Sequence, residues 1–217
     1  MKTLAMVLGL LFASTAQATL ITSASDLALT GGVTETFAGA INAYPTGLSS
    51  STFNIQNPSN NNRLQIYDNS YTSYAGINNS SNFLYFDYND RRFGSGATEF
   101  TPNPLKVIFN QATSAFGFNY AQNCSSFELA IFNILNELIE SHFIAFNTND
   151  LNAYAGASSS QNIAYFIIQE TSEGGSGSID EGYLDNLTTV TSVPLPGAIS
   201  LFIFGLGFWG FARHKFG

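Results

Sequence analysis

The last 25 residues are the feature that most constrains the structure this chain can adopt, because they carry an apolar run that is flanked by prolines and basic residues. From position 197 to 212 no residue is charged. A helix there would be roughly 24 Å long, against a bilayer hydrocarbon core of ~30 Å. Pro194 and Pro196 mark its start, because proline is tolerated only in the first turn. Since Arg213 and Lys215 can snorkel to the interface, we expect a transmembrane helix at about 197–212.

The alternative is a buried helix at the end of a soluble domain, because an apolar run of this length is compatible with both. Two features favour the membrane. The run is apolar on every face, and Gly205, Gly207 and Gly210 would weaken a helix in water. The basic residues after position 212 then predict a cytoplasmic C-terminus.

The start of the chain has the pattern of a secretory signal peptide. Lys2 is followed by a short apolar stretch, and Ala16-Gln17-Ala18 matches the small-residue pattern of a cleavage site. We therefore expect residues 1–18 to be removed by a cut after Ala18. Together with the C-terminal span, this places a single domain, residues 19–192, outside the cytoplasm.

Residues 193–217 resemble the PEP-CTERM sorting signal in its Val-Pro-Leu-Pro-Ala variety. The resemblance rests on three parts in order: Val193-Pro194-Leu195-Pro196, a glycine-rich apolar run, and a basic end with Arg213 and Lys215. Gly197 stands where that variety has alanine. The resemblance implies processing by an exosortase in a bacterium that makes extracellular polysaccharide. The protein would be anchored in the inner membrane before processing and would then reach the cell surface or the biofilm matrix.

The domain is strongly acidic, which argues against nucleic acid as a partner. All 15 acidic residues of the chain lie in 19–192, against four basic ones, Arg63, Arg91, Arg92 and Lys106, so its formal charge is −11. No basic groove is available to neutralise phosphates. Cys124 is the only cysteine, so an internal disulfide is excluded.

Short runs of β-forming residues, separated by polar turns, predict an all-β fold. We interpret residues 134–140 as a turn and a short strand, although their propensity also allows a helical turn. The number and spacing of the runs favour an antiparallel β-sandwich. The expected strands are 33–37, 53–56, 64–67, 83–88, 105–109, 115–120, 127–132, 142–146, 163–169 and 183–189.

The order of these strands also resembles the jelly-roll bodies that precede PEP-CTERM signals and that are similar to carbohydrate-binding modules. Such a body would bind polysaccharide through aromatic rings and amide or carboxylate groups. Tyr71, Tyr74 and Asn78, in one polar loop, have this composition, and so does the segment 87–92. The alternative is that the tyrosines pack at the rim of the sandwich while asparagine and serine form turns.

Groups suited to catalysis are scarce. His142 is the only histidine of the domain, and we interpret it as structural. Cys124 has no basic neighbour in sequence that would lower its pKa. Asp87 and Asp90 would serve a glycosidase only at the separation that the reaction requires. Two classes remain, a non-catalytic surface protein that binds glycan and an extracellular polysaccharide hydrolase, and we favour the first.

The resemblance to jelly-roll modules further implies a structural calcium ion between the first and last strands. Glu35 and Asp185 lie in the first and last clear strands. Their carboxylates, with nearby carbonyl groups, fit the oxygen ligands that Ca²⁺ prefers. The alternative is that Asp185 and Asn186 hydrogen-bond a neighbouring turn.

Overall fold

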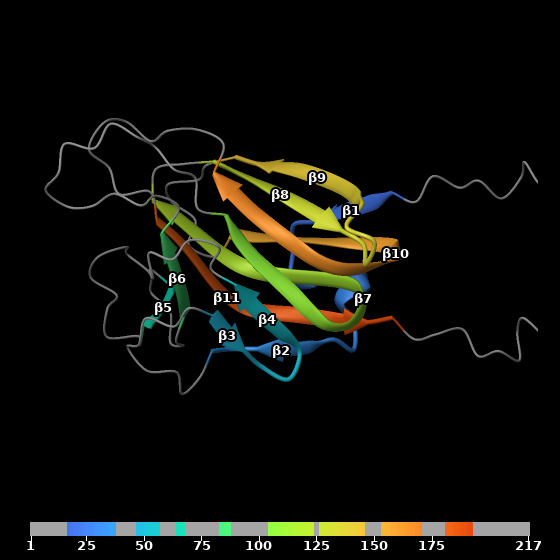
Figure 1. Ribbon diagram of the computed structural model, residues 1–217, viewed down its shortest axis with the longest axis horizontal. Coiled ribbons are helices and arrows are strands. Elements are labelled where there is room, and N and C mark those ends of the chain that lie inside the picture. Colours follow the sequence, from blue (N-terminus) through green and yellow to red (C-terminus); the bar gives the residue numbers. More distant parts are fainter. Residues whose placement is uncertain are drawn as a thin grey trace, which may run out of the picture.

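The computed structural model describes residues 17–37, 47–56, 64–67, 83–87, 104–123, 126–145, 153–170 and 181–192. Every strand pairing in this part of the chain is antiparallel, which confirms the all-β antiparallel class (Figure 1). The elements are β1 (Ala18–Ile21), the 3-10 helix η1 (Leu27–Leu29), β2 (Val33–Glu35), β3 (Gly47–Ser49), β4 (Phe53–Gln56), β5 (Leu64–Tyr67), β6 (Phe83–Asp87), β7 (Leu105–Asn123), β8 (Phe127–Phe132), β9 (Leu138–Ile144), β10 (Ala153–Glu170) and β11 (Glu181–Thr191).

Two long strands, β7 and β10, fold the sheet back on itself. The start of β7 pairs with β4, and its second half pairs with β11. Likewise the end of β10 pairs with β8, whereas its first half pairs with β1. We call β3, β4, the start of β7, the end of β10, β8 and β9 the β8 layer, and the remaining strands the β11 layer. A register shift between Ser158 and Ile163 marks the bend of the β7–β10 pair.

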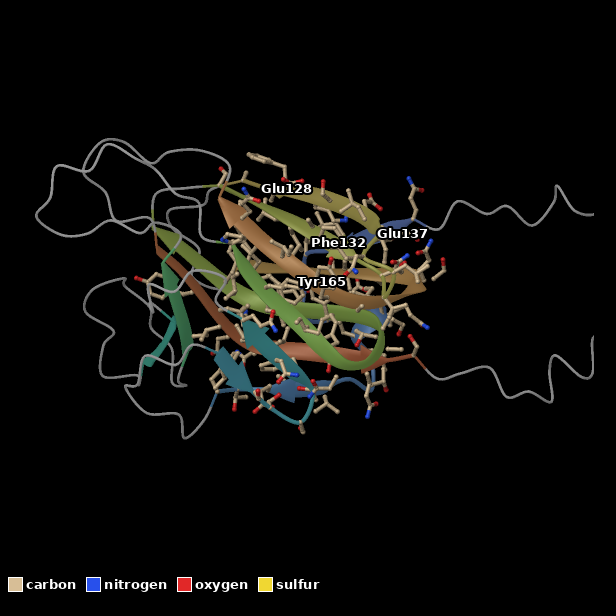
Figure 2. The ribbon with its side chains drawn as sticks, in the orientation of Figure 1. Glu128, Phe132, Glu137 and Tyr165 are labelled. Carbon is tan, nitrogen blue, oxygen red and sulfur yellow. The ribbon has the colours of Figure 1, made fainter. Side chains whose placement is uncertain are left out.

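Strand β8 shows how the sequence separates the two faces of the β8 layer. Phe127, Leu129 and Ile131 are buried, and the residues between them are partly exposed. Successive side chains of a strand point to opposite faces, so the period of two puts one face in the core and the other towards solvent. Glu128 and Phe132 lie on the solvent face, and both are labelled in Figure 2.

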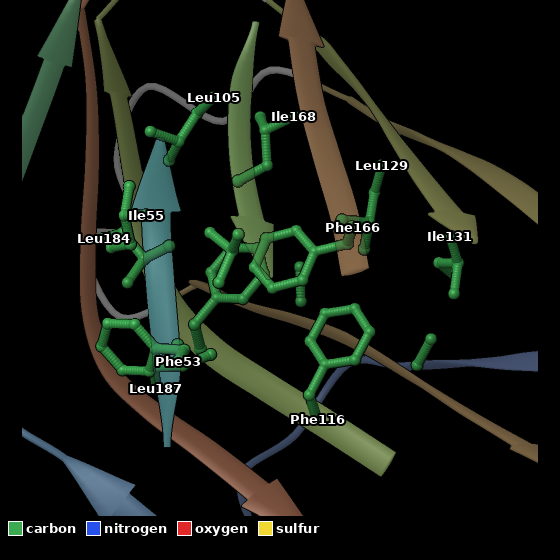
Figure 3. Packing of buried hydrophobic residues seen from close by; sticks show 14 of the residues in the cluster. Phe53, Ile55, Leu105, Phe116, Leu129, Ile131, Phe166, Ile168, Leu184 and Leu187 are labelled. Atoms are coloured by element: carbon green, nitrogen blue, oxygen red, sulfur yellow. The ribbon is translucent and has the colours of Figure 1, made fainter. Parts of the chain in front are cut away.

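Phenylalanine is the commonest residue in the core between the layers. The rings of Phe116 and Phe166, both labelled in Figure 3, are parallel within 2° with centroids 4.4 Å apart. The ring centroids of Phe109 and Phe118 lie 5.8 and 5.4 Å from that of Phe166. Phe116, Phe118 and Phe166 have no solvent exposure. A fully buried side chain of this kind stabilises the fold by roughly 1.5–3 kcal/mol, so this cluster accounts for much of the stability that a domain without disulfides needs.

A bulge in β11 keeps its leucines on the core side. Asp185 pairs with Asn119 and Thr188 with Gly117, so β11 has one residue more than β7 in this interval. Asn186 takes up the extra length with a φ of 50°, a conformation that asparagine tolerates better than most residues. Leu184 and Leu187 consequently both reach the core, although they are three positions apart.

Several predicted boundaries were wrong. Residues 105–109 and 115–120 belong to one strand, β7, because the polar residues at its bend stay extended. Similarly β10 begins at Ala153, ten residues before the predicted strand, and includes the polar run at 158–162. The short strands β1 and β3 were not predicted. The turn expected in 134–140 is confirmed at 133–137, but the short strand expected after it and the strand expected at 142–146 form one strand, β9.

Residues 1–16 and 193–217 lie outside the described part of the chain, so the signal peptide and the sorting signal stay predictions. Within the described ranges no helix is both long and apolar enough to cross a bilayer. The predicted cut after Ala18 falls at the first residue of β1, which pairs with Ser159.

Candidate functional site

The outward face of the β8 layer combines aromatic, charged and amide side chains on adjacent strands. We call this surface the outer face. All its side chains are partly or fully exposed. They point to solvent because successive residues of a strand face opposite sides, and the residues that alternate with them lie in the core. It comprises Asn54 and Gln56 of β4, Lys106 and Ile108 of β7, Tyr165, Ile167 and Gln169 of β10, and Glu128, Ala130 and Phe132 of β8.

Three side chains of the outer face form an ordered stack across three strands. Phe132 and Tyr165 are direct cross-strand partners, with ring centroids 4.7 Å apart and planes within 10°. The Lys106 Nζ lies 4.0 Å from the centroid of the Tyr165 ring. Because β10 lies between β7 and β8, Lys106 and Phe132 cover opposite sides of Tyr165. Aromatic and cation–π contacts of this kind stabilise by roughly 0.5–1.5 kcal/mol each, so the stack is held in place before any ligand arrives.

Hydrogen-bonding groups flank this stack. Glu128 lies opposite Gln169 on β10 and opposite Phe143 on β9. The Phe143 ring is 65% exposed. At the other margin, Asn54 Nδ2 donates to Asn110 Oδ1 at 2.6 Å. The outer face therefore offers apolar ring surface beside carboxylate, amide and ammonium groups, which is the combination that recognises a polyhydroxylated ligand.

The β8–β9 turn next to the outer face is fixed by one asparagine. Asn133 Oδ1 accepts the backbone N–H groups of Leu135 and Glu137, at 2.9 and 3.0 Å. Its Nδ2 donates to Glu137 Oε2 at 2.8 Å. Asn136 closes the turn with a φ of 62°. These bonds use the Glu137 carboxylate for structure and hold the turn in one conformation.

His142 and Glu140 point from β9 into the space between the layers. The imidazole Nε2 is 4.0 Å from Glu140 Oε1, and the His142 side chain is mostly buried. Within the described residues, His142 Nε2 and Glu140 Oε2 are buried without a hydrogen-bond partner. Strand β9 is at the edge of the sheet order, and inward-pointing charges are one way in which proteins discourage further strand addition at an edge. This placement agrees with a structural role for His142.

The two predicted calcium ligands lie on adjacent strands, β2 and β11. Glu35 of β2 pairs with Leu187, whose side chain is in the core, so Glu35 is on the core side of the sheet. Asp185 is 3% exposed and pairs with Asn119. Its two carboxylate oxygens accept from the backbone N–H and the Nδ2 of Asn186, at 2.7 and 3.2 Å. The described residues contain no cluster of three or more His, Cys, Asp or Glu side chains placed to hold a metal, and the calcium site stays a prediction.

The other predicted site residues lie outside the described residues. They are Tyr71, Tyr74 and Asn78 of the proposed glycan loop and the sorting-signal residues Val193, Pro194, Leu195, Pro196, Arg213 and Lys215. Conversely, sequence reasoning missed Lys106, Phe132 and Tyr165. The period-two pattern of β8 could have identified Phe132 as a solvent-facing residue, but only the strand register shows that it meets Tyr165.

No protein-family model and no curated protein matches the chain. Three solved structures superimpose on it with low scores and low sequence identity. The K2 cleaved adhesin domain of Lys-gingipain superimposes with a TM-score of 0.48 and 8% identity, over 75% of this chain and 99% of that one. TmCBM61 in complex with β-1,4-galactotriose superimposes with a TM-score of 0.39 and 10% identity, over 73% of this chain and 99% of that one. The lectin domain of lectinolysin complexed with Lewis B antigen superimposes with a TM-score of 0.36 and 9% identity, over 78% of this chain and 99% of that one. Structures this distant do not identify a ligand for this chain.

Proposed function

We propose that this protein is a non-catalytic, exported protein that binds polysaccharide through the outer face. The observation that carries the proposal is the ordered stack of Lys106, Tyr165 and Phe132, with Glu128 and Gln169 beside it. Sugar rings have apolar C–H surfaces and hydroxyl rims. A surface that places ring carbons beside hydrogen-bond donors and acceptors matches both.

The stack also indicates how a glycan chain would lie. Both sides of the Tyr165 ring are covered, by Phe132 and by Lys106, so a sugar cannot insert between them without displacing one. A ligand would instead extend across the strands, resting on the exposed edges of the stack and on the Phe143 ring. Such binding suits an extended polysaccharide better than a single buried sugar, because each contact is shallow.

Export and anchoring belong to the same proposal and rest on sequence. The signal peptide delivers the domain across the inner membrane, and the helix at about 197–212 holds it there until an exosortase acts near residues 193–196. Intact-mass measurement of the protein from its native host tests this, since a mature form that retains Trp209 would rule out removal of the C-terminal helix.

An extracellular hydrolase is the second candidate, and the Glu140–His142 pair is the observation that favours it. A carboxylate next to an imidazole can serve as acid and base. The pair points into the space between the layers, however, whereas a glycosidase needs its carboxyl groups on both sides of an accessible sugar bond. Release of reducing ends that is abolished by Glu140→Gln would establish the enzyme.

Native affinity electrophoresis through gels that contain soluble polysaccharides tests the binding proposal. The full chain is kept in a detergent without a sugar headgroup, so that the detergent does not compete for the site. We expect at least one polysaccharide to retard the wild type and Tyr165→Ala to weaken retardation about tenfold, which corresponds to ~1.4 kcal/mol. Leu27→Ala, at an exposed position on η1, is the matched control. Equal retardation of Tyr165→Ala and wild type would contradict the assignment of the outer face.

A further inference from the structure

Three separate parts of the chain meet at one end of the domain, at the right of Figure 1. Strand β11 ends there, where the Ser192 N–H donates to the Ala112 carbonyl at 2.8 Å. Strand β1 starts there, opposite Ser159 of β10. The β8–β9 turn joins them, because Asn133 Nδ2 lies 3.5 Å from Gln161 Oε1 in the bend of β10. We call this the exit end, since residues 193–217 continue from it.

The exit end carries most of the exposed apolar side chains of the described residues. Ile134 and Leu135, at the tip of the β8–β9 turn, are 81% and 72% exposed, and Leu27 of η1 is 88% exposed. Val33, which pairs with Thr189 near the end of β11, and Leu138, which follows the turn, are also exposed. A single exposed apolar residue is ordinary, whereas several on one end mark a contact surface.

The tip presents its apolar pair in a fixed geometry. The bonds from Asn133 to the N–H groups of Leu135 and Glu137 hold the turn closed. Ile134 and Leu135 therefore cannot fold back onto the sheet without breaking this turn. Ordering costs free energy when it happens on binding, and here the turn is ordered beforehand.

The short connection between Ser192 and the predicted helix at 197–212 indicates that a bilayer covers the exit end. Five residue steps separate Ser192 from Gly197, and an extended chain spans at most ~3.6 Å per step, or roughly 18 Å. The headgroup zone adds only about 5–8 Å on each side of the hydrocarbon core. A domain on so short a connection must sit against the membrane surface, and the exit end is the part that faces it.

We propose that the exit end docks on the lipid bilayer, with Ile134, Leu135 and Leu27 in the boundary between headgroups and acyl chains. This inference rests on the membrane insertion of residues 197–212 in the proposed function. Lys106 is the only basic residue among those described, and it belongs to the outer face. The described side chains of the exit end that would meet lipid are apolar, so we expect the contact on uncharged phosphatidylcholine and at high salt alike.

Quenching of tryptophan by brominated lipid tests this docking. The full chain is placed in phosphatidylcholine vesicles, with its single tryptophan, Trp209, reporting on the helix. In a Trp209→Phe background, Leu135→Trp reports on the exit end. Phe143→Trp, an exposed aromatic position towards the other end of β9, is the matched control. We expect brominated phosphatidylcholine to quench Trp209 and the Leu135→Trp probe, with a blue-shifted emission for the latter, and to leave the Phe143→Trp probe unchanged.

The possible failures are distinguishable. If Trp209 is not quenched, the helix is not in the bilayer, and both the anchor and the docking inference fall. If Trp209 is quenched but the Leu135→Trp probe is not, the anchor stands and the docking is wrong. Equal quenching of the Leu135→Trp and Phe143→Trp probes would also overturn the inference, because the domain would then have no preferred end. Binding to carbohydrate is untouched by any of these results.

Discussion

Substituting alanine for each of two facing glycines tests how closely β7 and β10 approach. Gly117 and Gly156 are direct cross-strand partners. A Cβ at Gly156 would overlap the Phe116 carbonyl oxygen and lie 2.5 Å from Gly117 Cα, which are both backbone atoms. A Cβ at Gly117 would instead meet the Tyr154 ring, with its nearest carbon at 2.5 Å and its hydroxyl oxygen at 2.7 Å. The two sites differ in whether the obstacle can move.

This difference sets the expected magnitudes. At Gly156 the two strands themselves must separate to make room for a Cβ. We therefore expect Gly156→Ala to lower the free energy of unfolding by about 3 kcal/mol or more, the upper end of the range for overpacked cores. For a domain of this size that lowers Tm by roughly 6–12 °C. At Gly117 the obstacle is the end of a side chain, which shifts at a lower cost than a backbone, and the lower entropy of the unfolded chain returns about 0.4–1 kcal/mol. We therefore expect Gly117→Ala to change Tm by less than ~4 °C.

Thermal unfolding followed by far-ultraviolet circular dichroism measures both variants against the wild type under one set of conditions. The double variant adds a check, because its effect should be dominated by Gly156→Ala. Equal destabilisation by the two single variants would refute the argument that backbone contact, and not crowding in general, decides the outcome. A Gly156→Ala variant as stable as wild type would show that the strands are further apart than described.

Further predictions concern the aromatic core, the buried Tyr154, the sheet edge and the metal. Phe166→Ala should lower the free energy of unfolding by about 3–5 kcal/mol, because it empties the centre of the aromatic cluster; urea denaturation measures it. Burial raises the pKa of Tyr154, and a hydrogen bond with Thr188 lowers it by less. Ionisation thus weakens the fold as pH rises above ~10, and Tyr154→Phe should remove that pH dependence, as melting curves across pH will show. The double variant Glu140→Leu/His142→Leu should remain folded but aggregate through the β9 edge, which light scattering detects. If the calcium hypothesis holds, Ca²⁺ raises Tm in the wild type and not in Asp185→Ala, and an unchanged wild-type Tm would exclude the ion.

The class of fold was predictable because it depends on local patterns. The alternation in 127–132 predicts a strand with one buried face, and the structure places Phe127, Leu129 and Ile131 in the core. The continuity of β10 was not predictable in the same way. Polar residues at 158–162 normally indicate a turn, and here they remain extended because the strand passes from one layer to the other at this point.

The site was less predictable because it depends on register. Nothing in sequence shows that Lys106, Phe132 and Tyr165 come together, since they belong to three strands and meet only through pairing. Asp185 shows the converse limit. Its place in the last strand was correct, but the bulge at Asn186 sets which way its carboxylate points, and that follows from a backbone conformation and not from composition.

Hydrogen–deuterium exchange of the full chain, with and without a polysaccharide that retards it in electrophoresis, tests the central claim most directly. We expect slower exchange in β8 and in the end of β10, the strands that present Phe132 and Tyr165, with no change in β2 or β11. Tyr165→Ala should abolish this protection. Protection confined to residues 68–82, with β8 and β10 unaffected, would contradict the account and place the ligand on the loop of Tyr71 and Tyr74 instead.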